Sequence, residues 1–309
     1  MMKRFLLILI LITASWSLSA QEMTMAEFQR RYTNLVSRVG PGGLGVETLL
    51  DKWEAAWPGD VQMLVARYAF CLTRSRSTRI IQLEQDRYLG REPILPMKDS
   101  TGKKCNFFED FDFDEDLYAQ ANLYIDRAIQ ARPFRLDYRM AKIDAMLAFE
   151  KEQPDMTLVQ LKALADKNFQ ERPVWEYEGL EKVTPEQFVA FMQDYCVALF
   201  RLGSDASAEA FRDLSLHMLT YCKNEPLFLD NLGSYYLVKK DYKQALKYYD
   251  QVLKKHPGDM TALQNCLLLA RTKKDVKLEK KYLALMAKNG ATETDRASAQ
   301  MRLEAYGKK

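Results

Sequence analysis

One stretch of 34 residues, 226–259, constrains the fold of this chain more than any other: it reads PLFLDNLGSYYLVKKDYKQALKYYDQVLKKHPGD. Its first half has side chains suited to packing at positions i, i+3, i+4 and i+7, which lie on one face of a helix. These residues are Leu229, Leu232, Gly233 and Tyr236. The same period continues in the second half, where it places Ala245, Tyr249 and Val252 on one face.

The residues between and after these two halves predict where each helix ends. Lys240-Asp241 interrupts the pattern and predicts a turn, and Pro257-Gly258 stops the second helix. Gly233 and Ala245 are small, as two helix backbones that approach closely require. We therefore expect two short helices folded back on each other, and such a pair cannot bury its own apolar face without neighbours.

This segment resembles a tetratricopeptide repeat (TPR). The residues at the signature positions of that family are Leu232-Gly233, Tyr236, Ala245, Tyr249 and Pro257, while Leu229 stands where the family prefers Trp. The resemblance implies an all-α, TPR-like right-handed solenoid of helical hairpins. It also implies that the first helix of each hairpin lines a concave groove for extended peptides or helices.

Weaker helical periodicity extends this expectation to most of the chain. Residues 21–169 are expected to form degenerate hairpins, residues 170–183 a linker, and residues 184–309 the C-terminal hairpins, with 226–259 the best repeat. The spacing of the best repeat is kept by Ala121, Ile125, Ala128 and Pro133. Thr184 to Gln187 reads as a capping box with Pro at the first turn of a helix.

Residues 74–115 depart from this rhythm and predict a small inserted β-hairpin. Residues 93–97 and 103–108 are the expected strands, and residues 99–102 the turn between them. The following segment FFEDFDFDED is expected to be an acidic loop with its phenylalanines turned inward.

The net charge and the N-terminal residues limit which cellular compartment and which class of partner are expected. The formal net charge is only +3, which gives no field for nucleic acid. Residues 1–20 have a charged start, an apolar run of about ten residues and small residues near the end, which is typical of a secretory signal peptide. We expect an exported chain, periplasmic or extracellular, without a transmembrane segment. The cysteine count is five, and Cys196 and Cys222 are expected to lie too far apart to form a disulfide.

Motifs for cofactors, metals and catalysis lack the sequence context that such sites require. Gly40, Gly42 and Gly45 formally fit a dinucleotide motif, but a helix pattern rather than a strand precedes them. Asp112, Asp114 and Asp116 alternate as calcium ligands do, but the glycine of an EF-hand loop is missing. His217 and His256 are isolated. We therefore expect no catalytic residues, no metal site and no cofactor.

The expected function is a non-enzymatic scaffold in the cell envelope that binds a protein or peptide. By the TPR resemblance, the groove residues of the best repeat would be Asp230, Asn231, Ser234, Leu237 and Val238. Two alternatives remain open at this point. Trp175 and Tyr177 in the linker could stack on sugars in a glycan-binding helical protein of nutrient uptake, or the chain could be an enzyme with an unrecognised site.

Overall fold

The computed structural model describes residues 23–307, and these form helices with one two-stranded sheet. The expected signal peptide, residues 1–20, lies outside the described residues. The elements in chain order are α1 (Met25–Val39), α2 (Val46–Ala56), α3 (Val61–Ser75), β1 (Arg76–Leu83), β2 (Asn106–Phe113), α4 (Glu115–Ala131), α5 (Leu136–Glu150), α6 (Asp155–Glu171), α7 (Pro185–Leu202), α8 (Asp205–Tyr221), α9 (Pro226–Val238), α10 (Tyr242–Lys255), α11 (Met260–Thr272), α12 (Val276–Asn289) and α13 (Glu293–Gly307).

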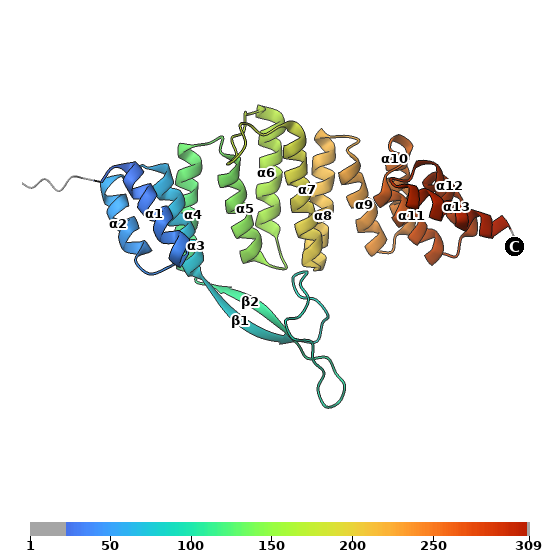
Figure 1. Cartoon of the computed structure of the whole chain (residues 1–309), viewed down its shortest axis with the longest axis horizontal. Coiled ribbons are helices and arrows are strands. Elements are labelled where there is room, and N and C mark those ends of the chain that lie inside the picture. The colour runs from blue at the N-terminus through green and yellow to red at the C-terminus, as the bar shows by residue number, and fades with distance from the viewer. Residues whose placement is uncertain (1–22, 308–309) are drawn as a thin grey trace, which may run out of the picture.

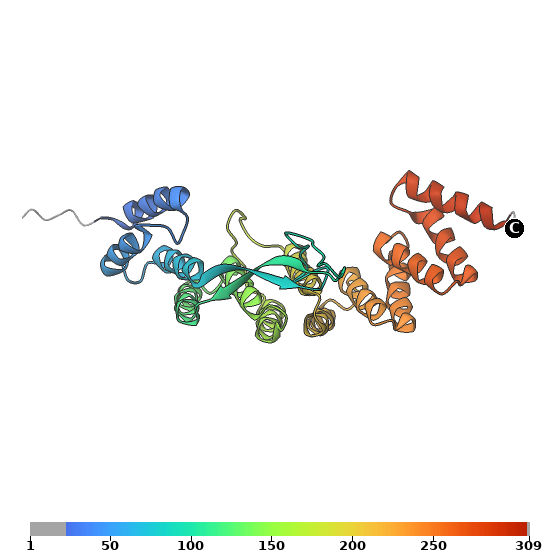
Figure 2. The same ribbon diagram turned by 90° about the horizontal axis from the view of Figure 1, so that it is seen from below.

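The helices stand side by side in an elongated row, and each packs mainly on its neighbours in the chain (Figure 1). Seen from below, the row is an arc whose two ends bend to the same side (Figure 2). Helices α3, α5 and α7 lie toward the inner side of this arc, and α4, α6 and α8 lie toward the outer side. The prediction of a helical chain with a small β-hairpin insertion is thus confirmed.

Local signals in the sequence explain where several helices begin. Thr184 caps α7 by accepting a hydrogen bond from the backbone N–H of Gln187 (3.2 Å), and the Gln187 side chain accepts from the backbone N–H of Thr184 (2.9 Å). This is the predicted capping box, which satisfies two backbone donors that a helix start leaves free. Asp60 and Asp259 cap α3 and α11 by accepting from the backbone N–H of Gln62 and Ala262, each directly after a Pro-Gly pair.

The hairpin of α9 and α10 has the predicted boundaries. Lys240 adopts a left-handed conformation (φ 61°) in the turn, and Asp241 caps α10. The side chains of Leu232, Ala245 and Tyr249 are fully buried. A Cβ on Gly233 would lie 2.4 Å from Cε1 of Tyr249, so only glycine fits against this ring.

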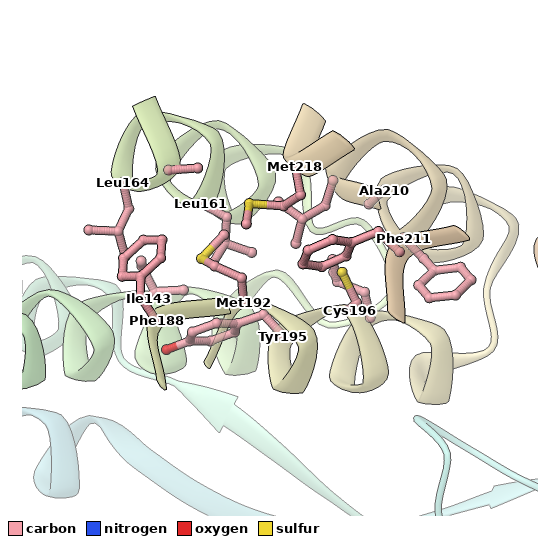
Figure 3. Close-up of a cluster of buried hydrophobic side chains, with 14 of the residues drawn as sticks. Ile143, Leu161, Leu164, Phe188, Met192, Tyr195, Cys196, Ala210, Phe211 and Met218 are labelled. Carbon is pink, nitrogen blue, oxygen red and sulfur yellow. The ribbon is translucent and has the colours of Figure 1, made fainter. Parts of the chain in front are cut away.

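The apolar core is a succession of three clusters along the row, each shared between neighbouring helices. The first is centred on Trp53, the second includes Trp175, and the third includes Tyr249. In the second cluster, side chains of α6 and α8 point toward Met192 and its neighbours on α7 (Figure 3). The protein therefore has no single centre, and each helix pair depends on the next one for burial.

The inserted hairpin is present, but its long strands are residues 76–83 and 106–113 rather than the predicted 93–97 and 103–108. Strand β1 pairs antiparallel with β2, in a register that runs from Arg76 opposite Phe113 to Leu83 opposite Asn106. The predicted strand 93–97 pairs only briefly, through a bridge between Leu95 and Phe107 and a bond from the Cys105 N–H to the Met97 carbonyl (3.0 Å), and the predicted turn 99–102 is closed by a bond from the Gly102 N–H to the Asp99 carbonyl (3.0 Å). Residues 76–83 were missed because β1 is exposed along most of its length and shows no alternation of polar and apolar residues.

The segment predicted as an acidic loop is also corrected, because most of it is strand β2. Phe108 and Asp110 are buried on one face of this strand, so an aspartate and a phenylalanine are turned toward the helices together. We call residues 76–113 the arm. It leaves the row between α3 and α4 and runs beneath the following helices (Figures 1 and 2).

The linker between α6 and α7 is ordered by its tryptophan. Only 2% of Trp175 is exposed, and its Nε1–H donates to Oδ1 of Asn168 (2.9 Å). The guanidinium of Arg139 lies 5.7 Å from the centre of the Trp175 rings. All five cysteines are free, so Cys196 and Cys222 form no disulfide, as predicted.

The contact between Gly233 and Tyr249 yields a prediction about stability. Alanine in place of glycine within a helix normally gains about 1 kcal/mol, but overpacking a filled core costs about 1–3 kcal/mol. Tyr249 is fully buried and its hydroxyl bonds to Ser234, so the ring has no room to move. We expect Gly233→Ala to lower the free energy of unfolding by about 1–2 kcal/mol in chemical denaturation.

Gly59→Ala is the matched control, because a Cβ at Gly59 would meet no atom within 4 Å. It should change the free energy of unfolding by less than about 0.5 kcal/mol. Equal effects of the two substitutions would contradict the close helix contact.

Candidate functional site

The five predicted groove residues on α9 differ widely in accessibility. Asp230 and Asn231 are buried, each with 7% of its surface exposed. Ser234 and Leu237 are partly buried, and Val238 is 58% exposed. The five residues therefore do not form one open surface, and the two most polar of them lie between helices.

Asn231 joins three helices through its side-chain amide. Nε2 of Gln193 on α7 donates to its Oδ1 (3.0 Å), and its own Nδ2 donates to Oε1 of Gln193 (2.7 Å). Nδ2 also donates to Oγ of Ser215 on α8 (3.1 Å). A buried amide with this many bonds fixes the relative position of α7, α8 and α9, because any shift would leave polar groups unpaired.

Asp230 lies beside Asp259, the residue that caps α11. Burial raises the pKa of Asp230 to about 8, and the neighbouring Asp259 carboxyl adds to the rise. Its Oδ1 has no hydrogen-bond partner among the described residues when the group is ionised. With its pKa at about 8, the Asp230 carboxyl is mainly protonated at neutral pH, which relieves its repulsion with Asp259.

One stripe along α9 combines this acid with exposed apolar side chains. Leu227, Asp230, Ser234 and Val238 follow one another at intervals of three or four residues and so share a helix face. We call these four residues the α9 stripe. Leu227 and Val238 at its ends are exposed, whereas Ser234 near its middle shares a hydrogen bond with the Tyr249 hydroxyl (3.1 Å). The stripe offers apolar contacts at both ends and little free polar surface between them.

A second concave region lies between α1, α3 and α5 and the linker. It encloses a cavity of about 470 Å³, with Gln62, Arg135, Tyr138 and Tyr177 in its lining. The linker rises on the inner side of the arc at this place (Figure 2). Of the two predicted linker aromatics, only Tyr177 reaches this cavity, and its ring stacks on that of Phe191 with centres 5.1 Å apart.

The arm is anchored to the helices through Asp110 on β2. Its carboxylate accepts hydrogen bonds from Arg79 on β1 (2.8 Å), from Lys151 at the end of α5 (2.8 Å) and from the hydroxyl of Tyr88 (3.2 Å). Burial alone would raise the pKa of this carboxyl, but the bonds from Lys151 and Arg79 lower it below its usual value. Asp110 is thus held as an anion between two cations, and sequence reasoning had not singled it out.

Further along the arm, a tight turn meets the end of α7. Tyr88 and Arg91 exchange two backbone hydrogen bonds (3.0 and 2.9 Å), and the two residues between them both have positive φ. A Cβ on Gly90 would lie 2.2 Å from the carbonyl oxygen of Arg201, so the turn touches the backbone of α7. The arm is therefore attached at α5 and again at α7.

Three of the candidate metal and catalytic residues from the sequence, Asp112, Asp114 and His217, have structural partners. Asp112 pairs with Arg79 (2.8 Å), and Asp114 caps α4 by accepting from the N–H of Leu117 (2.9 Å). His217 lies 2.6 Å from a carboxylate oxygen of Asp166, and His256 follows the last residue of α10, in the predicted loop position. Within residues 23–307, no three His, Cys, Asp or Glu side chains gather closely enough to hold a metal ion.

The raised pKa of Asp230 beside Asp259 predicts an unusual dependence of stability on pH. A carboxyl whose pKa is higher in the folded than in the unfolded state binds more protons when folded, so stability falls as pH rises from about 4 to about 8. Asp230→Asn removes this titration and supplies an amide donor toward Asp259. The difference in free energy of unfolding, variant minus wild type, should therefore be about 1–3 kcal/mol larger at pH 9 than at pH 5.

Denaturant unfolding of both proteins at several pH values measures this difference, and titrations common to both cancel. A constant difference across the range would contradict the protonated Asp230.

The Asp110 anchor predicts how firmly the arm is held. Asp110→Ala leaves Arg79 and Lys151 without their shared carboxylate and should loosen the arm. We expect tryptic cleavage within residues 84–105 to become at least about tenfold faster, because each 1.4 kcal/mol lost multiplies the open population tenfold. Asp112→Ala, which removes a half-exposed partner of Arg79 on the same strand, should change the rate little. Similar rates for the two variants would contradict the anchoring role.

Comparison with protein-family models, with curated proteins and with solved structures finds no match to this chain. Among residues 23–307, no helix is both long and apolar enough to cross a membrane.

Proposed function

We propose that this protein is a non-enzymatic scaffold of TPR-like helical hairpins that binds an extended segment of another protein along the α9 stripe. The observation that carries the proposal is the α9 stripe, which ends in two exposed apolar side chains, Leu227 and Val238. Isolated exposed apolar residues are ordinary, but here two lie on one helix face in the best-defined hairpin.

The packing of the helices supports the TPR-like part of the proposal. Gly233 admits the Tyr249 ring, and Leu232 and Ala245 are fully buried, which are the roles that the TPR resemblance assigns to these residues. Consecutive helices pack in pairs, and each pair packs on the next. An architecture of this kind builds long surfaces suited to extended ligands.

The chemistry of the stripe favours a protein segment with apolar side chains. Asp230 is buried and mainly protonated at neutral pH, so it offers no charge to a ligand. Binding would then rest on apolar contacts at Leu227 and Val238 and on backbone or side-chain contacts near Ser234. The signal-like residues 1–20 support a location outside the cytoplasm, so the partner is proposed to be another protein of the cell envelope.

The structure does not favour the sugar-binding alternative, because its main candidate residue, Trp175, is buried. Trp175 is almost fully buried and held by Asn168, so it presents no face on which a sugar could stack. One face of the Tyr177 ring is covered by the stacked ring of Phe191. Replacement of Trp175 by alanine would therefore report on folding of the linker rather than on sugar binding.

Site-specific photocrosslinking tests the scaffold proposal. A photoreactive amino acid at Val238 should yield a discrete adduct in the native envelope, and mass spectrometry should identify the attached protein. With that partner purified, Val238→Arg should weaken binding at least about tenfold, because a bulky charge cannot be accommodated in an apolar contact. The measurement is the dissociation constant, with thermal unfolding as a check that the variant is folded.

Val159 on α6 is the matched control, because it is a valine of similar exposure (53%) on a helix of the outer side. Neither the crosslinker nor an arginine at position 159 should have these effects. Equal crosslinking at both positions, or unchanged binding by Val238→Arg, would refute the assignment of the α9 stripe.

A further inference from the structure

A cavity of about 280 Å³ lies between the arm and the helices that it crosses. The arm contributes Leu89 and the phenylalanines of β2, α5 contributes Leu147 and Ala148, and the end of α7 contributes Leu202. Ligand cavities in proteins span about 300–1,000 Å³, so this one lies just below the lower end of the range. Its size suits one small molecule rather than a segment of folded protein.

Positive charge exceeds negative charge around this cavity. The charged side chains in the lining are Arg76, Arg91, Lys151, Asp110 and Asp144. Asp110 already has two cationic partners, Lys151 and Arg79. Arg76 and Arg91 form no ion pair with any of residues 23–307, so two guanidinium groups remain without a counter-charge.

Both of these arginines are held against aromatic rings of the same strand. The Cζ atom of Arg76 lies 5.3 Å from the ring centre of Phe113, and that of Arg91 lies 5.6 Å from the ring centre of Phe111. A guanidinium stacked on a ring keeps its N–H edges free, and its geometry matches a carboxylate. The two arginines are thus oriented before any ligand arrives, which lowers the entropic cost of binding.

The turn that carries Arg91 is conformationally costly. Leu89 has φ 48°, a conformation that a leucine rarely adopts, and Gly90 follows with φ 73°. Glycine or asparagine would fit the first of these positions with less strain. The leucine side chain instead forms part of the cavity wall, and the contact of Gly90 with the Arg201 carbonyl holds the turn in place. Strain of this kind is concentrated at functional sites.

Asp144 is the one carboxylate in the lining without a cationic partner among the described residues. Its Oδ1 accepts a hydrogen bond from the hydroxyl of Tyr195 (2.8 Å). It is accessible at the cavity, yet the protein around it displaces enough water to raise the pKa of its carboxyl. Asp144 therefore opposes an anionic ligand, and this opposition weakens as it takes up a proton.

We propose that this cavity binds a small organic anion, a carboxylate with an apolar or aromatic body, which Arg76 and Arg91 hold by its charged end. The apolar body lies among Leu89, Phe111, Phe113 and Leu147. A ligand at this place contacts both the arm and the helices, so its binding adds to the attachment of the arm to α5 and α7. This site is separate from the α9 stripe, and the proposal does not depend on the scaffold function.

Binding of 3-phenylpropanoate to the whole mature chain, followed by saturation-transfer NMR and calorimetry, tests the site. The neutral 3-phenylpropanamide has the same shape and should bind at least about tenfold more weakly, because it forms no charge-assisted bonds. Arg76→Gln and Arg91→Gln should each weaken binding of the carboxylate about tenfold or more. Asp144→Asn should strengthen it, since it removes the opposing charge.

Arg87→Gln is the matched control, because Arg87 is an exposed arginine of the arm that pairs with Glu92 and does not line the cavity. It should leave the affinity unchanged, and thermal unfolding of each variant confirms folding. The proposal is overturned if millimolar 3-phenylpropanoate, in 10-fold molar excess over the protein, does not bind. It is also overturned if the amide binds as tightly as the carboxylate, or if Arg87→Gln and Arg91→Gln lower the affinity equally.

Discussion

A pair of helices leaves one apolar face uncovered, and most of this structure follows from the need to cover it. The uncovered apolar face of each pair packs against the next pair. The core is therefore divided into three clusters along the row instead of being gathered at one centre. The fit of the Tyr249 ring over Gly233 shows how close the backbones must come for this burial to be complete. The final helix, α13, covers the last pair, and its Arg302 and Tyr306 bind the buried Glu279 of α12.

Polar side chains inside the row fix the positions that apolar burial leaves undetermined. Apolar packing tolerates small slides of one helix along another, whereas the exchange of bonds between Asn231 and Gln193 permits only one arrangement. The protonated Asp230 and the capping Asp259 play a similar part between α9 and α11. Two of the residues expected to bind a partner are thus committed to holding the scaffold together.

The sequence predicts most of the helical architecture because its signals are local. The period of residues 226–259, the turn at Lys240 and the capping box at Thr184 all depend on residues within one or two helical turns. Strand β1 was missed because its pairing with β2 is set across a loop of 22 residues, 84–105, and its exposed side chains carry no period. The burial of Asp230 and Asn231 depends on α7 and α11, and the anchor at Asp110 depends on a lysine 41 residues away, so neither is visible in local sequence.

The arm changes how a row of this kind responds to force. Repeats that touch only their neighbours behave as springs in series, and each one yields independently of distant ones. Here a brace that starts between α3 and α4 is fastened at Lys151 and again at the end of α7, so it bridges units that are not adjacent. The arm thereby couples the N-terminal and middle parts of the arc, and its last point of attachment is the end of α7.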